Sequence, residues 1–348
     1  MRELLTIVGS GMSEIFYAYI GTYSSHGSEG IYRVEISGEG TARIIGSYPA
    51  RDASYLASDG KKLAAVFESR ENSAVALYGI EPDGALTPIG EKPSGGLAPC
   101  YAAFDDDNVY TANYFTGQAG VYPLANGGLG DGQWIAHWGS GVNKSRQECS
   151  HAHCAVPIGP VSSGESYLAV CDLGTDHVWF YPRENGRITL PGYGVETPPG
   201  TGPRHMTAIN DSTWAVIGEM SCETLIYSGY ADKARLVQRL PFARTMGDPA
   251  NTAAALRLSP DKTTLLGSIR GENTLAVSRK VNGRFETPVI VDARGNWPRD
   301  AAFTPDGRYV LAALERSHEI TVFRTTDTGL EYVSKTDIPA PTCVCFPR

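Results

Sequence analysis

Short apolar runs separated by polar turns recur along most of the chain. Each repeat reads as an apolar strand, a turn rich in Asp, Gly or Pro such as SPD or TPDG, and a second apolar strand. A polar break and a third strand with alternating residues follow, as in ITVF or VWFY, and this pattern is typical of antiparallel strands. Six segments share it: residues 54–78, 100–124, 153–181, 204–227, 254–278 and 299–323.

The spacing of these repeats predicts their architecture. Successive copies start about 45–53 residues apart, which is in the range of β-propeller blades. Each copy continues into a weaker fourth strand, for example ALTPIGEKP or LEYVSKTDIP, and four antiparallel strands make one blade. An array of β-sandwiches or two all-β domains fits poorly because no linker-like tract divides the chain. A dinucleotide-binding unit fits worse, since no G-x-G-x-x-G follows a strand;.

The two ends of the chain together supply a seventh blade. FYAYIGTY, GIYRVEI and ARIIGSYP give three strands without an innermost one, and PTCVCFP is an innermost strand without followers. Joining them closes the ring and removes the exposed sheet edges. We therefore predict an all-β fold, a seven-bladed β-propeller of four-stranded antiparallel blades. It forms a single domain over residues 16–348, after an N-terminal extension of residues 1–15.

Composition and charge narrow the class of protein. The 348 residues carry 30 Lys and Arg against 38 Asp and Glu, a net charge of −8, whereas a nucleic-acid groove needs a surplus of basic residues. No run approaches the ~20 apolar residues of a membrane span, and no secretory signal is evident. The seven cysteines form no disulfide framework;. We expect a cytoplasmic monomer or homodimer without nucleic-acid or membrane partners.

Equivalent positions in the repeats gather polar residues at one end of the central channel. The start of the first strand falls on Ser54, Cys100, His153, Arg204, Ala254 and Arg299. A position just after the second strand falls on Glu219, Arg270 and Glu315, with Asn113 and Asp172 one residue earlier in their copies. Strand ends at a channel mouth can hold polar groups without burying them unpaired.

Three arginines at one mouth of an acidic protein indicate an anionic ligand. The planar guanidinium matches a carboxylate or a phosphate. The alternative is that each arginine pairs with a nearby carboxylate, for example Arg299 with Asp300 or Glu315, but matched positions make this less expected for all three. His153 in SHAHCAV then predicts a neutral imidazole that acts as a general base, with Glu219 nearby;.

Other chemistries have weaker support in the sequence. His151 and His153 form an H-x-H pair, but no third ligand follows at a recognisable spacing, so no metal site is predicted;. No G-x-S-x-G elbow is present;. Cys154 and His205 directly follow His153 and Arg204, and alternation along a strand should turn both away from the channel. We therefore interpret His205 as structural.

At these residues the sequence resembles the lactonase family of seven-bladed propellers. That family contains the cycloisomerase-type 6-phosphogluconolactonases and is related to the carboxymuconate lactonising enzymes. The similar stretches are YIGTY, SHAHCAV, DLGTDHVWFY, TGPRHM, GEMSCET, SIRGENTLAV and GNWPRDAAFTPDGRYVLAA. The resemblance carries the family's active-site histidine onto His153 and its arginines onto Arg204 and Arg299. Its Asn-Glu and Asn-Arg-Gly-His elements keep Glu219 and Arg270 but lose both Asn residues and the His.

The resemblance implies a carboxylic-ester hydrolase without cofactor or metal that opens a sugar-type, anionic lactone resembling 6-phosphogluconolactone. Arg299 would hold the carboxylate or phosphate of this substrate. Two alternatives stay open: a muconate-type cycloisomerase that uses the same His, Arg and Glu, and a propeller scaffold that binds without chemistry. The predicted catalytic residues are His153, Glu219, Arg204 and Arg270. The predicted substrate-binding residues are His151, Arg299, Asn113, Asp172 and Glu315.

Overall fold

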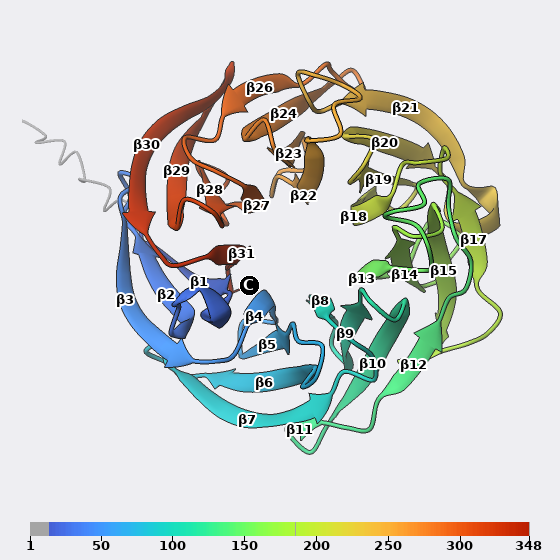
Figure 1. The fold of residues 1–348 in the computed structure, drawn as a ribbon, viewed down its shortest axis with the longest axis horizontal. Helices are drawn as coiled ribbons and strands as arrows, with labels where there is room; N and C mark the ends of the chain where they lie inside the picture. Colours follow the sequence, from blue (N-terminus) through green and yellow to red (C-terminus); the bar gives the residue numbers. More distant parts are fainter. Residues whose placement is uncertain (1–13, 185, 348) are drawn as a thin grey trace, which may run out of the picture.

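Seven antiparallel sheets form a closed ring in the computed structural model, which describes residues 14–184 and 186–347 (Figure 1). Each sheet is a blade whose first strand lies beside the central axis and whose last strand lies at the rim. This confirms the predicted seven-bladed all-β propeller. Residues 1–13, most of the predicted N-terminal extension, lie outside the described residues.

Six blades follow the six repeats in order. Blade 1 contains β4 (Ala53–Ser58), β5 (Lys62–Phe67), β6 (Ala74–Ile80) and β7 (Leu86–Pro93). Blade 2 contains β8 (Pro99–Phe104), β9 (Asn108–Asn113), β10 (Gln118–Ala125), β11 (Gly128–Leu129) and β12 (Gln133–Ala136). Blade 3 contains β13 (Ala152–Ile158), β14 (Tyr167–Asp172), β15 (His177–Glu184), β16 (Arg187–Ile188) and β17 (Tyr193–Glu196).

The second half of the ring is built in the same way. Blade 4 contains β18 (Pro203–Asn210), β19 (Thr213–Gly218), β20 (Glu223–Ser228) and β21 (Arg235–Pro241). Blade 5 contains β22 (Thr252–Leu258), β23 (Thr264–Arg270), β24 (Thr274–Val281), β25 (Arg284–Phe285) and β26 (Val289–Asp292). Blade 6 contains β27 (Pro298–Phe303), β28 (Tyr309–Leu314), β29 (Glu319–Thr326) and β30 (Gly329–Asp337). In blades 2, 3 and 5 the fourth strand is divided into two pieces that both pair with the third strand.

The closing blade combines strands from both ends of the chain, as predicted. It contains β31 (Pro341–Cys345), β1 (Phe16–Thr22), β2 (Gly30–Ile36) and β3 (Ala42–Pro49). Figure 1 shows the C-terminal β31 in red between the axis and the blue β1, and the pairing aligns Ile20 with Val344. Two short 3₁₀ helices, η1 (Ser24–His26) and η2 (Ala231–Lys233), lie in connections.

The core lies between neighbouring blades and explains the apolar repeats. Every residue of β14 and of β28 is buried, because adjacent sheets pack against both faces of a middle strand. The outer strands β7 and β30 are largely exposed and carry Glu, Lys and Thr. This difference is why the fourth strand of each repeat gave the weakest sequence signal.

The turns that mark the repeats are tight hairpin connections. In the TPDG turn of blade 6, Thr304 Oγ1 donates to Asp306 Oδ1 at 2.6 Å and accepts from the Tyr309 backbone N–H at 3.0 Å. Gly307 has a φ of 74°, a left-handed conformation that glycine adopts without steric cost. The turn therefore fixes the register of β27 against β28.

Each innermost strand leaves the regular register near its start. The pairing skips Ser54, Cys100, His153, Arg204, Arg299 and Thr342, and in blade 5 it skips Ala254 and Ala255. All of them except Ala255 and Thr342 are residues that the repeat alignment placed at the start of the first strand. A β-bulge adds one unpaired residue and re-aims side chains, so the irregularity turns residues of each innermost strand toward the axis, among them His153, Arg204 and Arg299.

Candidate active site

Two sets of equivalent residues meet at what we call the start face, the end of the axis where the innermost strands begin. The first set consists of the bulge residues just described. The second set lies at or just after the end of each second strand and consists of Tyr23, Glu68, Tyr114, Leu173, Glu219, Arg270 and Glu315. Because the second strands run antiparallel to the first, both sets lie at the same end of the axis;.

Glu219 lies at the centre of a cluster of guanidinium groups. Its Oε2 atom accepts a hydrogen bond of 2.8 Å from Arg204 Nε and lies 3.0 Å from Arg270 Nη2, and its Oε1 atom accepts from Arg146 Nη2. Only 3% of Glu219 is exposed. We call Glu219, Arg146, Arg204 and Arg270 the Glu219 cluster.

The irregular start of β22 helps to hold these arginines. Arg204 Nη1 donates to the Ala254 carbonyl at 2.6 Å, and Arg270 Nη2 donates to the Ala253 carbonyl at 3.0 Å. Because the strand leaves its register between Ala253 and Leu256, carbonyl groups there are available to side chains. Small alanines at this point leave room for two guanidiniums beside the backbone.

The Glu219 cluster carries an excess of positive charge. Burial alone would raise the pKa of Glu219, but Arg270, Arg204 and Arg146 hold it well below its usual range. Burial lowers the pKa of Arg270 to about 10, so this side chain is still a cation at neutral pH. Three guanidiniums therefore face one carboxylate, and two positive charges remain for a ligand.

His153 lies beside the cluster in a form suited to accept a proton. Its Nε2 atom is 3.8 Å from Glu219 Oε2, and its Nδ1 atom is 3.6 Å from Cys100 Sγ. Burial, followed by the charge of Arg204, holds the pKa of His153 well below its ordinary value, and Glu219 opposes this only in part. The imidazole is therefore neutral at physiological pH.

Arg299 lies on the other side of the start face among acidic partners. Its guanidinium donates to the Tyr23 hydroxyl at 2.5 Å and lies 3.5 Å from Glu68 and 3.6 Å from Glu315. Tyr23 also donates to Glu68 at 2.8 Å. Here one guanidinium faces two carboxylates, which is the reverse of the charge ratio around Glu219. We call Arg299, Tyr23, Glu68 and Glu315 the Arg299 cluster.

Asn113 and Asp172 contact loops rather than either cluster. Asn113 Nδ2 donates to the Ser94 carbonyl at 2.9 Å. Asp172 accepts from the Ser150 hydroxyl and the His151 backbone N–H, each at 2.8 Å. Both residues lie one position before the second set of start-face residues, and alternation turns their side chains to the flank of the blade. Their contacts support the loops that precede β8 and β13.

The loop between β12 and β13 brings two further residues to the start face. Arg146 bonds the Tyr114 hydroxyl at 3.2 Å as well as Glu219. His151 stacks on the Tyr114 ring, with centroids 4.4 Å apart, while His153 meets the same ring edge-on at 5.5 Å. His151 Nε2 also faces Glu148 and Cys149, and these three residues have the side-chain types of a metal site;.

His205 contradicts the expectation that it points away from the axis. Its Nε2 atom lies 3.2 Å from Arg204 Nη1. Its imidazole also makes edge-on contacts with Tyr55 of blade 1 and Tyr101 of blade 2. The bulge at Arg204 breaks the alternation, so consecutive side chains both face inward. The prediction of a structural role is compatible with its complete burial.

A second layer of side chains lies beneath the bulge residues along the axis. Tyr55 and Tyr101 stack with centroids 4.5 Å apart, and Arg257 pairs with Asp300 at 2.8 Å. Beyond this layer, a cavity of about 650 Å³ is lined by the later residues of all seven innermost strands, largely apolar ones. The His, Arg and Glu residues of the candidate site thus lie at the start face, whereas the cavity at the opposite end of the axis is lined mainly by apolar residues, with Arg257 at its edge.

Sequence reasoning missed three residues of the two clusters, Tyr23, Glu68 and Arg146, and also missed Tyr114 beside them. Tyr23, Glu68 and Tyr114 occupy the second equivalent position in the closing blade and in blades 1 and 2, so the count that found Glu219 would have found them. Arg146 comes from the loop between blades and has no equivalent in the repeats. No periodic signal could have placed it beside Glu219.

Comparison with known families fits this geometry. Residues 17–346 match the model of a family described as lactonase, 7-bladed beta-propeller. The chain belongs to this lactonase family. The expected resemblance and the enzyme class, a carboxylic-ester hydrolase of lactonase type, are thereby confirmed.

Similar proteins cover nearly the whole chain. The 6-phosphogluconolactonase of Bacillus subtilis (strain 168) is 29% identical over 95% of this chain and 98% of its own length. An uncharacterised protein of Staphylococcus saprophyticus is 31% identical over 95% of this chain and 99% of its own. Both similarities span all seven blades rather than a single motif.

Two solved structures superpose closely on this chain. A Bacteroides fragilis protein proposed to be a 6-phosphogluconolactonase has a TM-score of 0.87 and 27% identity, covering 97% of this chain and 99% of that one. The periplasmic gluconolactonase of Pseudomonas aeruginosa has a TM-score of 0.87 and 25% identity, covering 96% and 99%. Among the described residues, no helix has the length and apolar character needed to cross a membrane. The cytoplasmic location stays a prediction.

Proposed function

We propose that this lactonase-family protein hydrolyses an anionic sugar lactone of the 6-phosphogluconolactone type. The proposal rests on one observation above all: a buried histidine held neutral lies next to a cluster in which guanidiniums outnumber the carboxylate. A neutral imidazole can take a proton, and uncompensated cations favour an anionic substrate and an anionic intermediate. The names of the Bacillus subtilis and Pseudomonas aeruginosa relatives support a sugar lactone as the substrate class.

In this mechanism His153 is the general base. It takes a proton from a water molecule whose oxygen attacks the lactone carbonyl carbon, and the carbonyl electron pair moves onto the oxygen. When the tetrahedral intermediate collapses, the bond from that carbon to the ring oxygen breaks. The imidazolium then returns its proton to the leaving ring oxygen, so the products are a hydroxyl group and a carboxylic acid, which ionises to a carboxylate and releases one proton to solvent.

Arg204 and Arg270 stabilise the oxyanion in this proposal. Their guanidiniums are fixed before substrate arrives, by Glu219 and by the carbonyls at the start of β22. Donors aimed in advance at a developing charge are worth on the order of 3 kcal/mol each. Glu219 itself stays ionised, because its arginine partners hold its pKa low, and it acts by holding these arginines and by facing His153.

We assign the anionic group of the substrate to Arg146. Its side chain is 36% exposed, against 4% for Arg204 and 7% for Arg270, so it is the cation of the Glu219 cluster that solvent and ligand reach. Arg299 fits this role less well, because Glu68 and Glu315 already balance its charge. The Arg299 cluster presents donors and acceptors that suit the hydroxyl groups of a sugar.

His151, Asn113 and Asp172 support the site indirectly. His151 fixes the face of Tyr114, and Asp172 bonds the backbone of His151. Asn113 anchors the Ser94 carbonyl in the connection before β8. We therefore place these three in the group that positions the start-face loops, outside direct contact with the lactone.

The test is a panel of 6-phosphogluconolactone, gluconolactone and an uncharged lactone without hydroxyl groups, followed by acid release above the spontaneous rate. We expect the phosphorylated lactone to have the highest kcat/KM. His153→Ala should lower kcat by roughly 10²–10⁴, and His177→Ala, at the start of β15 away from both clusters, should not. No turnover of any lactone, or an unchanged kcat in His153→Ala, would reject the proposal.

A second assay with a muconate-type diacid separates the cycloisomerase alternative, because such diacids lose their conjugated ultraviolet absorption when the ring closes. A wild-type protein that closes such a ring while leaving sugar lactones intact would replace hydrolysis by cycloisomerisation. A protein inactive on both substrates would favour the binding scaffold.

A further inference from the structure

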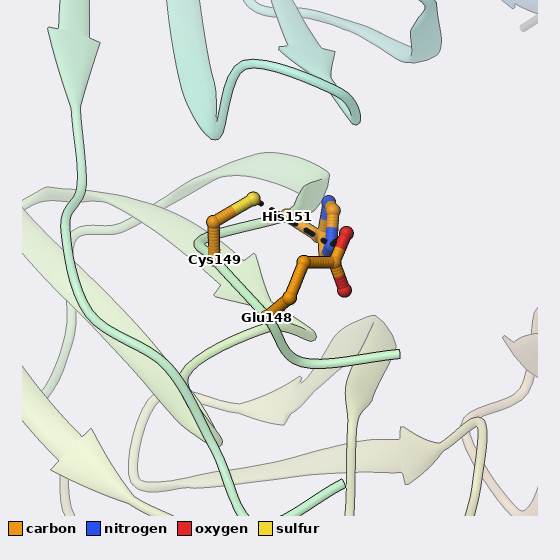
Figure 2. A group of neighbouring side chains, drawn as sticks. All are labelled: Glu148, Cys149 and His151. Atoms are coloured by element: carbon orange, nitrogen blue, oxygen red, sulfur yellow. Dashed lines mark hydrogen bonds and ion pairs between the residues drawn. The ribbon is translucent and has the colours of Figure 1, made fainter. Parts of the chain in front are cut away.

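Three potential metal ligands converge on the loop between β12 and β13, outside the Glu219 cluster. They are Glu148, Cys149 and His151, and their ligand atoms all lie within 4.8 Å of one another. Figure 2 shows the Cys149 sulfur and the Glu148 carboxylate next to the His151 ring. His151 Nε2 is 3.2 Å from Glu148 Oε1 and 3.9 Å from Cys149 Sγ.

The orientation of His151 makes this grouping chemically unusual. Its Nδ1 atom lies 2.9 Å from the Tyr114 carbonyl oxygen, and a carbonyl can only accept, so Nδ1 carries the hydrogen. In the neutral ring, Nε2 is then a bare acceptor facing a carboxylate oxygen at 3.2 Å. Two acceptors at this distance repel each other unless a cation, either a proton or a metal ion, lies between them.

The contact of His151 Nδ1 with the Tyr114 carbonyl is also what a metal-bound histidine needs. Histidines that bind metals usually donate their other ring N–H to a carbonyl or carboxylate, which fixes the tautomer and the ring plane. Here the ring plane is fixed further by stacking on Tyr114, with an interplanar angle of 13°. His151 is 3% exposed, so its Nε2 lone pair has a defined direction.

The thiol favours a metal over a proton. An imidazolium–carboxylate pair needs no third group, yet Cys149 also faces Nε2. A tetrahedral zinc ion with N, O and S ligands separates the ligand atoms by about 3.3–3.6 Å. The observed separations of 3.2 and 3.9 Å lie on either side of this range, so small rotations of two exposed side chains would complete the geometry.

We propose that Glu148, Cys149 and His151 bind one Zn²⁺ or a similar thiol-preferring divalent ion, with a fourth position open to solvent. The site departs from the sequence expectation of no metal. The proposed site joins His151 to its sequence neighbours Glu148 and Cys149. It does not include His153, which faces Cys100 and Glu219. The same loop carries Arg146, so a bound ion would also hold the loop that places this guanidinium on Glu219.

The probe is Co²⁺, which replaces zinc and gives a near-ultraviolet charge-transfer absorption when bound to a thiolate. The full-length protein is stripped with a chelator, dialysed and titrated with Co²⁺, and Zn²⁺ is then added as competitor. We expect one ion per chain, a charge-transfer band, and loss of that band when Zn²⁺ displaces Co²⁺. Zn²⁺ should also raise the Tm of the stripped protein.

Variants of the exposed ligands make the test specific. Cys149→Ser should abolish the charge-transfer band, and Glu148→Gln should weaken Co²⁺ binding at least tenfold, while far-ultraviolet circular dichroism stays unchanged. The matched control is Glu196→Gln, because Glu196 faces His177 at 3.8 Å in an exposed pair. The control should bind Co²⁺ like the wild type.

Two results would overturn the site. One is a wild-type protein that binds no Co²⁺ or binds it without a thiolate band. The other is a Cys149→Ser protein that keeps the wild-type stoichiometry and affinity. Either result would leave His151 and Glu148 as an imidazolium–carboxylate pair. The readouts are absorption and binding, so they do not depend on whether the protein turns over a lactone.

Discussion

The two sides of the start face use the same kinds of side chain in opposite proportions. In the Glu219 cluster three arginines surround one carboxylate, whereas in the Arg299 cluster two carboxylates and a tyrosine surround one arginine. Apart from Arg146, which comes from a loop, the members of both clusters occupy equivalent positions of the blades. Symmetry therefore decides where polar groups gather, and the local charge ratio decides what each group can do.

The difference also separates chemistry from recognition. An oxyanion and a phosphate need uncompensated cations, which only the Glu219 cluster provides. Sugar hydroxyls need mixed donors and acceptors without net attraction for anions, which the Arg299 cluster provides. His153 lies beside the first cluster, so the proposed base and the proposed oxyanion donors share one side of the axis.

Removal of one carboxylate should destabilise the protein more at the Glu219 cluster than at the Arg299 cluster, and this is the largest effect that we expect. Glu219→Gln leaves three guanidiniums without a counter-charge and should lower the free energy of unfolding by about 3–5 kcal/mol. Glu68→Gln leaves Arg299 with Glu315 and should cost less than about 1 kcal/mol. Urea unfolding of both variants measures the difference. Equal losses would show that the two sides are electrostatically alike.

Substitution of Arg146, the most exposed arginine of the Glu219 cluster, should change KM for a charged lactone more than for an uncharged one. Arg146→Gln should raise KM for a phosphorylated lactone about tenfold, the equivalent of about 1.4 kcal/mol, and leave KM for gluconolactone nearly unchanged. Arg70→Gln is the control, since Arg70 stacks on Phe115 next to Tyr114 without pairing with Glu219. If Arg146→Gln affects both lactones equally, the anion does not bind at Arg146.

The pH dependence should show the smallest but most diagnostic effect. An ordinary histidine base with a pKa near 6.5 would keep about a quarter of its activity at pH 6. The pKa of His153 is held well below that value by burial and Arg204, and the neutral form is the active one, so the acid limb moves to lower pH. We expect kcat/KM at pH 6 to stay close to its value at pH 7. A half-maximal rate near pH 6.5 would contradict this assignment.

The ring of blades could be predicted because its cause is periodic. Each blade needs a buried second strand and a tight turn, and these leave a repeated pattern of apolar runs and Asp/Gly/Pro turns. The closing blade followed from the same logic, since β31 and β1 each lacked a partner in the sequence pattern. The division of the fourth strand into two pieces lies at the exposed rim, where the apolar signal is weak.

Only the site residues that occupy equivalent positions in the blades could be predicted from the sequence. His153, Arg204, Glu219 and Arg270 come together because they occupy equivalent positions. Alternation failed at His205, because a bulge shifts the side chains that follow it.

The choice of ion-pair partner and the placement of a loop leave no periodic pattern in the sequence. The pairing of Arg299 with Glu68 joins blade 6 to blade 1, and the contact of Arg146 with Glu219 joins a loop to blade 4. Neither contact follows from a count along the repeat. The sequence pattern therefore predicts anion binding at Arg299, whereas the structure shows that Glu68 and Glu315 balance the charge of this residue.

Steady-state kinetics of Arg270→Met and Arg299→Met on a single sugar lactone test the division of labour most directly. If the Glu219 side stabilises the oxyanion, Arg270→Met should lower kcat by roughly 10²–10³ with little change in KM. Arg299→Met should instead raise KM and leave kcat nearly intact. A kcat loss in Arg299→Met as large as that in Arg270→Met would contradict the account.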